Sequence, residues 1–148
     1  SQNANRYLKE VFPEATHYFT PILNFTGQQF DTILLLMNGI GLAGTYQEVT
    51  PFLKHLASLL SPGGKILAES TDVIDIFKDE DGGMWVDLNT DYYGSFRFNM
   101  KYKDVESGWF NWIYLDKMNL EKFALEAGLT MEIIYDDKES FLIQLQKK

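Results

Sequence analysis

The chain has 148 residues, of which 45% are apolar and 23% are charged, and its formal net charge is −8. This length supports one domain, residues 1–148, and is too short for two. The acidic balance disfavours nucleic acids as partners, and the absence of cysteine excludes disulfides, thiolate metal sites and cysteine nucleophiles.

The N-terminal part begins with a polar, charged segment that does not resemble a signal peptide. Residues 6–12 are predicted to form the last turns of a helix that ends before Pro13, and residues 16–20 are predicted to form a short strand. The longest apolar run, residues 33–37, is far too short to span a bilayer. Because a chain without cysteine also fits a reducing compartment, we expect a cytoplasmic protein with no membrane partner.

Residues 30–37 predict a buried strand, because they are continuously apolar after Thr32 rather than alternating. A strand of this kind is covered on both faces, as in a parallel sheet. It runs into residues 38–41 (Asn-Gly-Ile-Gly), a sequence typical of a loop.

An amphipathic helix is predicted next. Residues 45–48 (Thr-Tyr-Gln-Glu) fit a capping box at its start, although Pro51 leaves open a start at Thr50. Pro and Gly within residues 61–64 end the helix, and residues 65–70 form the next strand, so the order predicts a parallel, right-handed βαβ unit. The apolar positions at helical spacing are Val49, Phe52, Leu53, Leu56, Leu59 and Leu60, and Phe52, Leu56 and Leu60 are expected to be buried against residues 33–37.

The second half of the chain changes its pattern. Residues 74–77 are predicted to form a short helix, and residues 78–94 are acidic, contain glycine and read as irregular. Residues 95–103 alternate apolar and polar side chains, which predicts a half-exposed antiparallel strand, with residues 109–115 as its partner across a turn at residues 104–108.

A second amphipathic helix is predicted to begin near Asp116 or Asn119 and to end at Gly128. Two strands, residues 129–135 and 140–146, close the chain. The sequence therefore predicts an α/β fold: a partial doubly wound, Rossmann-like sheet in which a parallel βαβ unit is followed by antiparallel strands.

In this order and spacing, the chain resembles the C-terminal part of a class I S-adenosylmethionine-dependent methyltransferase domain. The strand from residue 30 into Asn38-Gly39, the helix, the Ser-Pro-Gly-Gly turn at residues 61–64 and the strand after it resemble the fourth and fifth strands of that family. Residues 127–129 (Ala-Gly-Leu) and the last two strands resemble its closing antiparallel pair. Residues 108–112 (Gly-Trp-Phe-Asn-Trp) are similar to a stretch found in some bacterial members.

The family's first strand and its Gly-x-Gly-x-Gly loop have no counterpart in the chain, and neither does the acidic residue that holds the ribose. Those elements would supply backbone amides, a helix N-terminus and a carboxylate to the cofactor. Pro21 stands where the family usually has an acidic residue that contacts adenine, and proline has neither a carboxylate nor an N–H.

The resemblance implies that Asn38 and Gly39 lie beside the methionine part of the cofactor and the substrate. The carboxyl end of a parallel strand is also where doubly wound folds bind ligands. With the backbone of Ile22, these are the predicted cofactor-binding residues. A tight turn that needs a positive φ is an equal explanation for Asn38 and Gly39 from the residues alone.

Trp85 is the predicted substrate-binding residue, because methyltransferases of this class often close over substrates with segments inserted in this region. Trp109 and Trp112 are better explained by core or hairpin packing. No metal site is predicted, since residues 79–83 do not fit the spacing of a calcium loop. Neither histidine has partners for catalysis, but methyl transfer to a nucleophilic acceptor needs mainly positioning.

The resemblance implies a portion of an S-adenosylmethionine-dependent methyltransferase that acts on a small-molecule acceptor. The chain alone is expected to be inactive and to bind the cofactor weakly or not at all. A degenerate domain that serves as a non-catalytic binding or assembly module is the alternative. Without the first strand, residues 33–37 have a free edge, which either residues 16–20 or a second copy could fill, and we expect a homodimer.

Overall fold

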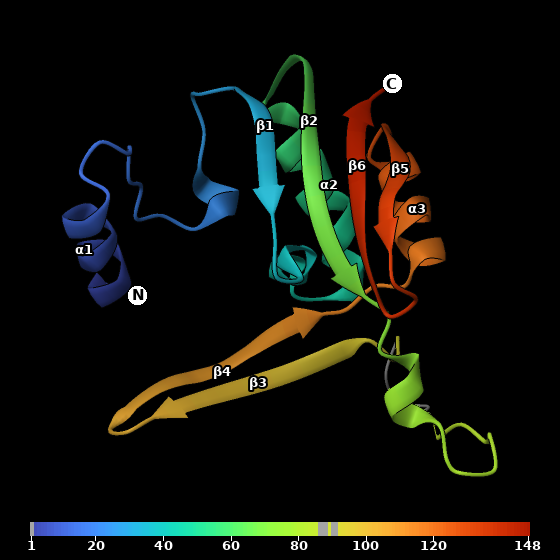
Figure 1. The fold of residues 1–148 in the computed structure, drawn as a ribbon. Coiled ribbons are helices and arrows are strands. Elements are labelled where there is room, and N and C mark those ends of the chain that lie inside the picture. Colours follow the sequence, from blue (N-terminus) through green and yellow to red (C-terminus); the bar gives the residue numbers. More distant parts are fainter. Residues whose placement is uncertain (1, 86–88, 90–91) are drawn as a thin grey trace.

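The computed structural model describes residues 2–85, 89 and 92–148 (Figure 1). Its main sheet has four strands in the order β1-β2-β6-β5, with β1 (Phe30–Leu35) parallel to β2 (Leu60–Thr71). The other neighbours, β6 (Ser140–Lys147) and β5 (Leu129–Asp136), run antiparallel. The predicted α/β fold, parallel first and antiparallel after, is confirmed. None of the helices among the described residues is long and apolar enough to cross a membrane.

The β1–α2–β2 unit forms because helix α2 (Val49–Ser58) buries its apolar stripe on the sheet. Phe52, Leu56 and Leu60 are 1%, 0% and 0% exposed, as predicted, and they share one core with Leu35. The prediction that residues 61–64 end the helix is wrong, because α2 ends at Ser58 and residues 61–64 belong to β2, where its register with β1 shifts. There Gly64 lies so close to the backbone that a Cβ would come within 2.9 Å of the Phe30 carbonyl oxygen.

The predicted capping box is wrong. Thr45 precedes a 3-10 turn, η3 (Tyr46–Glu48), rather than α2, and neither Thr45 nor Glu48 makes a side-chain cap hydrogen bond. Pro51 is the third residue of α2, within the first turn, where a missing N–H costs nothing.

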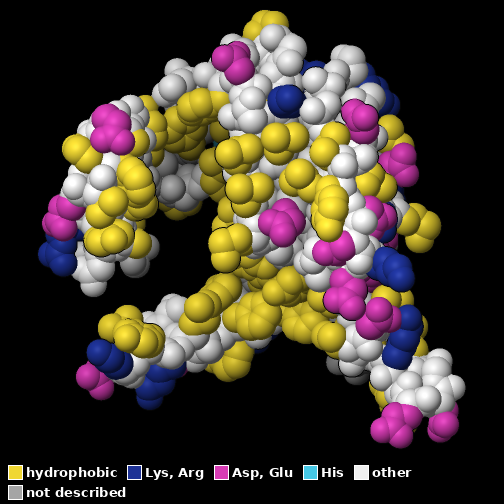
Figure 2. All heavy atoms as spheres, in the orientation of Figure 1, with side chains coloured by type: hydrophobic (Ala, Val, Ile, Leu, Met, Phe, Trp, Pro, Cys, Tyr) yellow, Lys and Arg dark blue, Asp and Glu magenta, His cyan; other side chains and the backbone are white. Residues whose placement is uncertain are grey.

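The prediction that residues 30–37 are covered on both faces is also wrong. The strand ends at Leu35, and Leu34 and Leu36 are 58% and 53% exposed. The reason is visible in Figure 1, where α2 and α3 lie behind the sheet and the front face carries no helix. Figure 2 shows hydrophobic side chains gathered on that front face.

Residues 16–20 form no strand. A strand needs a neighbour for its backbone groups, and no described strand lies beside this segment. The helix before it, α1 (Gln2–Val11), has no buried residue and stands apart from the sheet, with a hollow between the two (Figures 1 and 2). It ends before Pro13 as predicted.

The C-terminal elements agree with the sequence. Helix α3 (Lys117–Glu126) begins after Asp116, whose carboxylate accepts a hydrogen bond from the Asn119 amide at 2.9 Å. Gly128 follows the helix with a φ of +79°, a left-handed conformation that glycine adopts without strain. The last two strands pair across the turn at residues 137–139.

Strands β3 (Ser95–Tyr102) and β4 (Val105–Ile113) form the predicted hairpin, with a tighter turn than expected. It projects as an arm below the sheet, at the end to which β1 and β2 point (Figure 1). A 3-10 turn, η4 (Ile74–Phe77), stands where the short helix was predicted. Residues 86–88 and 90–91 of the irregular segment lie outside the described residues.

We predict that Leu56→Ala lowers the free energy of unfolding by about 2–5 kcal/mol, because it removes a side chain with 0% exposure and leaves a cavity. Leu125→Ala, the same change at a position that is 48% exposed, is the control and should cost less than about 1 kcal/mol. Urea unfolding followed by circular dichroism measures both. Equal losses for the two variants would show that α2 does not carry the core.

Candidate functional site

The end of β1 makes an uncommon backbone turn. Met37 and Asn38 both have a φ of 55°, in the left-handed region. Asn accepts this conformation readily, whereas for Met it costs of the order of 1 kcal/mol. The Met37 amide donates to Glu69 Oε2 on β2 at 2.7 Å, which holds the turn in place. Strain held in this way at the carboxyl end of a parallel strand is typical of a ligand site.

Asn38 is 8% exposed and carries a buried acceptor without a partner. Its Nδ2 donates to the carbonyl oxygen of Ile113 on β4 at 3.2 Å, while its Oδ1 makes no hydrogen bond among the described residues. An orphan buried acceptor costs about 1–3 kcal/mol. A donor group on a ligand would relieve that cost, so this atom is a candidate contact for such a donor, although the protein encloses it.

A glycine pattern follows that the sequence analysis missed. Gly39, Gly41 and Gly44 have the Gly-x-Gly-x-x-Gly spacing of a nucleotide-binding loop after a strand. The structure gives Gly39 and Gly41 packing roles, since both are buried in the 3-10 turn η2 (Gly39–Ala43), whereas Gly44 follows the turn with a φ of +81°. A Cβ on Gly41 would lie 2.2 Å from the Trp112 indole ring. The pattern here seats a tryptophan and does not cradle a phosphate.

An aromatic pocket of about 270 Å³ lies between the end of β1 and the hairpin arm. One wall is Met37, and the others come from alternate residues of β3 and β4 and from Tyr114, just beyond β4. The lining residues are Met37, Phe98, Met100, Phe110, Trp112 and Tyr114.

Ile22 lies in a separate place, in the 3-10 turn η1 (Ile22–Asn24). Its carbonyl oxygen contacts His55 Nε2 at 2.8 Å, which gives this histidine a structural partner on the side of α2. Its side chain lines an apolar groove of about 420 Å³ beside β1, together with Tyr18, Phe25 and Phe30. Ile22 and Asn38 therefore flank β1 without sharing a pocket.

Trp85 lies beyond η4, and its side chain is 77% exposed. Its amide donates to the Phe77 carbonyl oxygen at 2.9 Å. It does not line the aromatic pocket, and its role toward a substrate stays a prediction. Trp109 is 66% exposed under the Arg97 guanidinium, whereas Trp112 packs on η2.

A network of tyrosine and aspartate side chains ties the base of the hairpin to the sheet. Tyr92 Oη donates to Asp116 Oδ2 at 2.6 Å, and Tyr93 Oη donates to Asp72 Oδ1 at 2.7 Å. Asn119 Nδ2 also donates to Asp116 Oδ2, at 2.6 Å. Segments from β2, the hairpin and α3 thus meet at two carboxylates.

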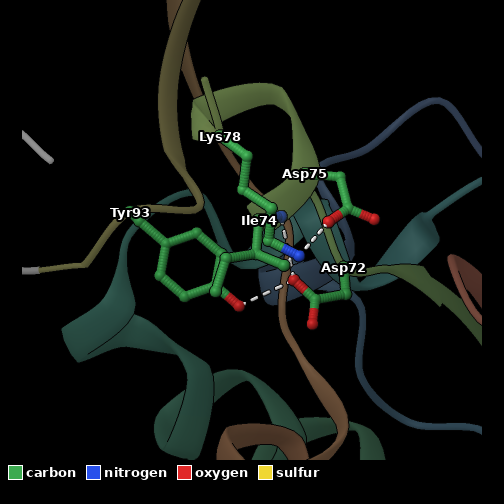
Figure 3. A network of polar contacts seen from close by, with 5 residues as sticks. All are labelled: Asp72, Ile74, Asp75, Lys78 and Tyr93. Atoms are coloured by element: carbon green, nitrogen blue, oxygen red, sulfur yellow. Dashed lines mark hydrogen bonds and ion pairs between the residues drawn. The ribbon is translucent and has the colours of Figure 1, made fainter. Parts of the chain in front are cut away.

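Figure 3 shows the Asp72 end of this network. Asp72 Oδ1 accepts both the Tyr93 hydroxyl and the Ile74 amide, the latter at 3.0 Å, and so holds the start of η4. Asp75 and Lys78 form an exposed ion pair beside it. That pair is too exposed to contribute much stability.

The network perturbs the titration of its members. Burial raises the pKa of Tyr92, and the hydrogen bond to Asp116 adds to the effect. Burial also opposes ionisation of Asp116, but hydrogen bonds from Tyr92 and Asn119 outweigh it and hold the pKa of this carboxyl below its usual range. Asp116 is therefore a charged acceptor at neutral pH, used to fasten the hairpin.

Comparison with known proteins shows which solved structures have a similar fold. No protein-family model matches the sequence, and a search of curated proteins finds no match. A solved S-adenosylmethionine-dependent methyltransferase from Bacteroides fragilis, in complex with S-adenosyl-L-homocysteine, is 32% identical over 99% of this chain, with a TM-score of 0.88. The chain spans only 60% of the length of that enzyme.

More distant structures share the fold. DesVI from Streptomyces venezuelae is 16% identical, with a TM-score of 0.67 over 100% of this chain and 72% of its own. CalS10, an amino pentose methyltransferase from Micromonospora echinaspora, is 11% identical, with a TM-score of 0.62 over 100% of this chain and 71% of its own. The predicted likeness to part of a methyltransferase domain is confirmed.

We predict that Asp116→Asn lowers the free energy of unfolding at pH 7 by roughly 1–3 kcal/mol, because asparagine keeps the helix cap but loses the charged acceptor. Because the pKa of Asp116 is lower in the folded state than in the unfolded state, its ionisation stabilises the folded state at any pH above the unfolded pKa of about 4. This stabilisation is lost as the pH falls through the pKa of the folded state. The difference between variant and wild type should therefore shrink below about pH 4. Urea unfolding between pH 3 and 7 measures it.

The exposed Asp75→Asn is the control and should change stability by at most about 0.5 kcal/mol. An Asp116→Asn effect that is the same at pH 3 and pH 7 would contradict the charged role of Asp116.

Proposed function

We propose that this chain, which has the fold of the C-terminal part of a class I S-adenosylmethionine-dependent methyltransferase, forms the acceptor side of a methyl-transfer site. The observation that carries the proposal is the 32% identity, over 99% of the chain, to an enzyme solved with S-adenosyl-L-homocysteine. The strained turn and the orphan acceptor at the end of β1 support it, since they lie where that fold binds ligands.

S-adenosylmethionine, when bound, supplies an electrophilic methyl group. The residues of this chain that would hold it are Asn38 and Gly39 at the end of β1, and the backbone of Ile22. Their work is to orient the cofactor and exclude water, because a nucleophilic acceptor needs positioning rather than a catalytic base. Asn38 Oδ1 is the atom in this set with a free, buried acceptor function among the described residues.

The rest of the cofactor site lies outside this chain. The Gly-x-Gly-x-Gly loop and the ribose carboxylate are absent from the sequence, and Pro21 offers adenine neither a carboxylate nor an N–H. The groove beside β1 faces the position that the family's first strand would take. The chain alone is therefore proposed to be inactive, and active only when those elements are supplied.

The acceptor is proposed to be a small molecule, met in the cytoplasm. The aromatic pocket has the volume of a single ring system rather than of a polymer. A negative net charge of −8 disfavours a nucleic-acid acceptor.

A non-catalytic binding or assembly module is the second candidate, and Pro21 favours it. The two candidate functions predict different S-adenosylmethionine binding for a longer polypeptide that contains the missing elements. A chimera that places the N-terminal part of the Bacteroides fragilis enzyme ahead of residue 1 should bind S-adenosylmethionine if the site is functional. No binding by a folded chimera would favour the module.

We predict that the chain alone binds S-adenosylmethionine with a dissociation constant no better than millimolar, about −4 kcal/mol. The reason is that Ile22, Asn38 and Gly39 replace only a fraction of the contacts of a complete site. Isothermal titration calorimetry of the chain and of the chimera measures the difference. Micromolar binding by the chain alone would contradict the division of the site between two parts.

We also propose that the isolated chain is a homodimer. β1 has a single neighbour among the described strands, and exposed Leu34 and Leu36 lie beside its free edge. Such an edge pairs with another copy, most simply about a two-fold axis. Sedimentation equilibrium at micromolar concentration should give twice the 17.1 kDa chain mass. Leu34→Lys should give a monomer while the exposed control Leu125→Lys stays dimeric; a monomeric wild type would contradict the proposal.

A further inference from the structure

We infer that the aromatic pocket is the acceptor subsite of the function proposed above, and that it selects acceptors with a neutral, flat, single-ring group. The sequence pattern does not predict a ligand site here, because it favours packing for Trp112 and substrate binding for Trp85. That the ligand is the methyl acceptor rests on the proposed function, whereas the chemistry of the ligand is argued from the pocket itself.

The hairpin arm has two different faces. Strand alternation and register put Phe98 opposite Phe110 on one face, and Asn99 opposite Trp109 on the other. The first face is a run of rings, with centroids 6.1 Å apart for Phe98–Phe110 and 6.3 Å apart for Phe110–Trp112. The Phe110 and Trp112 planes meet at 81°, so they form a corner rather than a flat wall. A corner of rings accepts a further ring by edge-to-face and stacked contacts.

Met37 lines the pocket on the sheet side and connects it to the proposed cofactor residues. It is the residue before Asn38, and it is 87% exposed although it is apolar. A thioether beside rings makes favourable contacts with aromatic ligands and adapts to their shape. A ligand in the pocket would therefore contact Met37, the residue before Asn38, at the end of β1.

Two contacts between distant segments fix the root of the arm beside the pocket. Trp112 packs on Gly41, where there is no room for a Cβ, and Asn38 Nδ2 bonds to the Ile113 carbonyl oxygen. Both fix the root of the arm against the end of β1. A preformed site binds without first ordering its own walls.

The side chains that line the pocket favour one class of ligand over others. The lining contains no charged side chain, and its polar side-chain atoms are the Tyr114 hydroxyl and the Trp112 indole nitrogen. An anion would lose hydration and gain no cationic partner. A cation would gain from the ring faces, but it would remain partly hydrated at the open side of the pocket. A neutral ring would bury apolar surface against every wall, and the pocket volume of about 270 Å³ suits one ring.

The test uses the 148-residue chain and p-cresol as the probe, with tetramethylammonium as a cation of similar bulk and cyclohexanol as a non-aromatic ring. The chain has three tryptophans, so the three indole N–H signals in a ¹H–¹⁵N spectrum are assigned by single replacements. We expect p-cresol to shift the Trp112 signal saturably, and to bind at least fivefold more tightly than cyclohexanol or tetramethylammonium.

Two variants remove walls of the pocket without touching the buried root of the arm. Met100→Ser, at a position 65% exposed, and Phe98→Ser should each weaken p-cresol binding at least fivefold. Trp109→Ser is the matched control, because it removes an exposed ring from the opposite face of the same arm, and it should leave binding unchanged.

Tighter binding of tetramethylammonium would overturn the neutral-ring assignment, and binding that survives both wall variants would place the probe elsewhere. A Trp112 signal that shifts with protein concentration alone would assign the aromatic face to a second copy. Failure of the chimera to bind S-adenosylmethionine would remove the proposed function and leave p-cresol binding intact, so the two failures are distinguishable.

Discussion

Among the described residues, helices cover one face of the main sheet, and the other face is open. α2 and α3 bury one side, where Leu56, Ile66 and Ile143 have no exposed area. The other side leaves Leu34 and Leu36 more than half exposed. Continuously apolar strands are typical of a sheet that is buried on both faces. The sequence of β1 therefore fits a sheet whose front face is covered, and the described residues do not cover it. The apolar surface that results favours association with more polypeptide.

The hairpin arm extends the structure in another direction and depends on a few contacts at its root. The packing of Trp112 on Gly41 and the hydrogen bond from Asn38 to Ile113 hold β4 to the end of β1. Tyr92 and Tyr93, just before β3, donate hydrogen bonds to the carboxylates of Asp116 and Asp72, which lie at the start of α3 and just after β2. The arm is thus fastened on both sides at the carboxyl edge of the sheet. One set of contacts therefore fixes the fold and shapes the proposed acceptor pocket.

The chain resembles a methyltransferase over 60% of the length of that enzyme, and the proposed site is divided in a corresponding way. In the proposal, the end of β1 and the arm contribute the contacts to the reacting end of the cofactor and to its acceptor. The contacts to the remainder of the cofactor would come from elements absent from this sequence. Such a division would separate affinity for the cofactor from the choice of the acceptor.

The sequence by itself determined the elements whose pattern is local: the buried stripe of α2, the alternation of the arm, the Asp116 start and Gly128 end of α3, and the closing strand pair. Their order also indicated the family likeness. Only the tertiary structure decided that residues 16–20 form no strand, that Thr45 caps no helix, and that Gly41 seats Trp112. The physical reason is that helical and strand periodicity depend on neighbours in sequence, whereas strand pairing, burial of a face and the lining of a pocket depend on groups that folding brings from far along the chain.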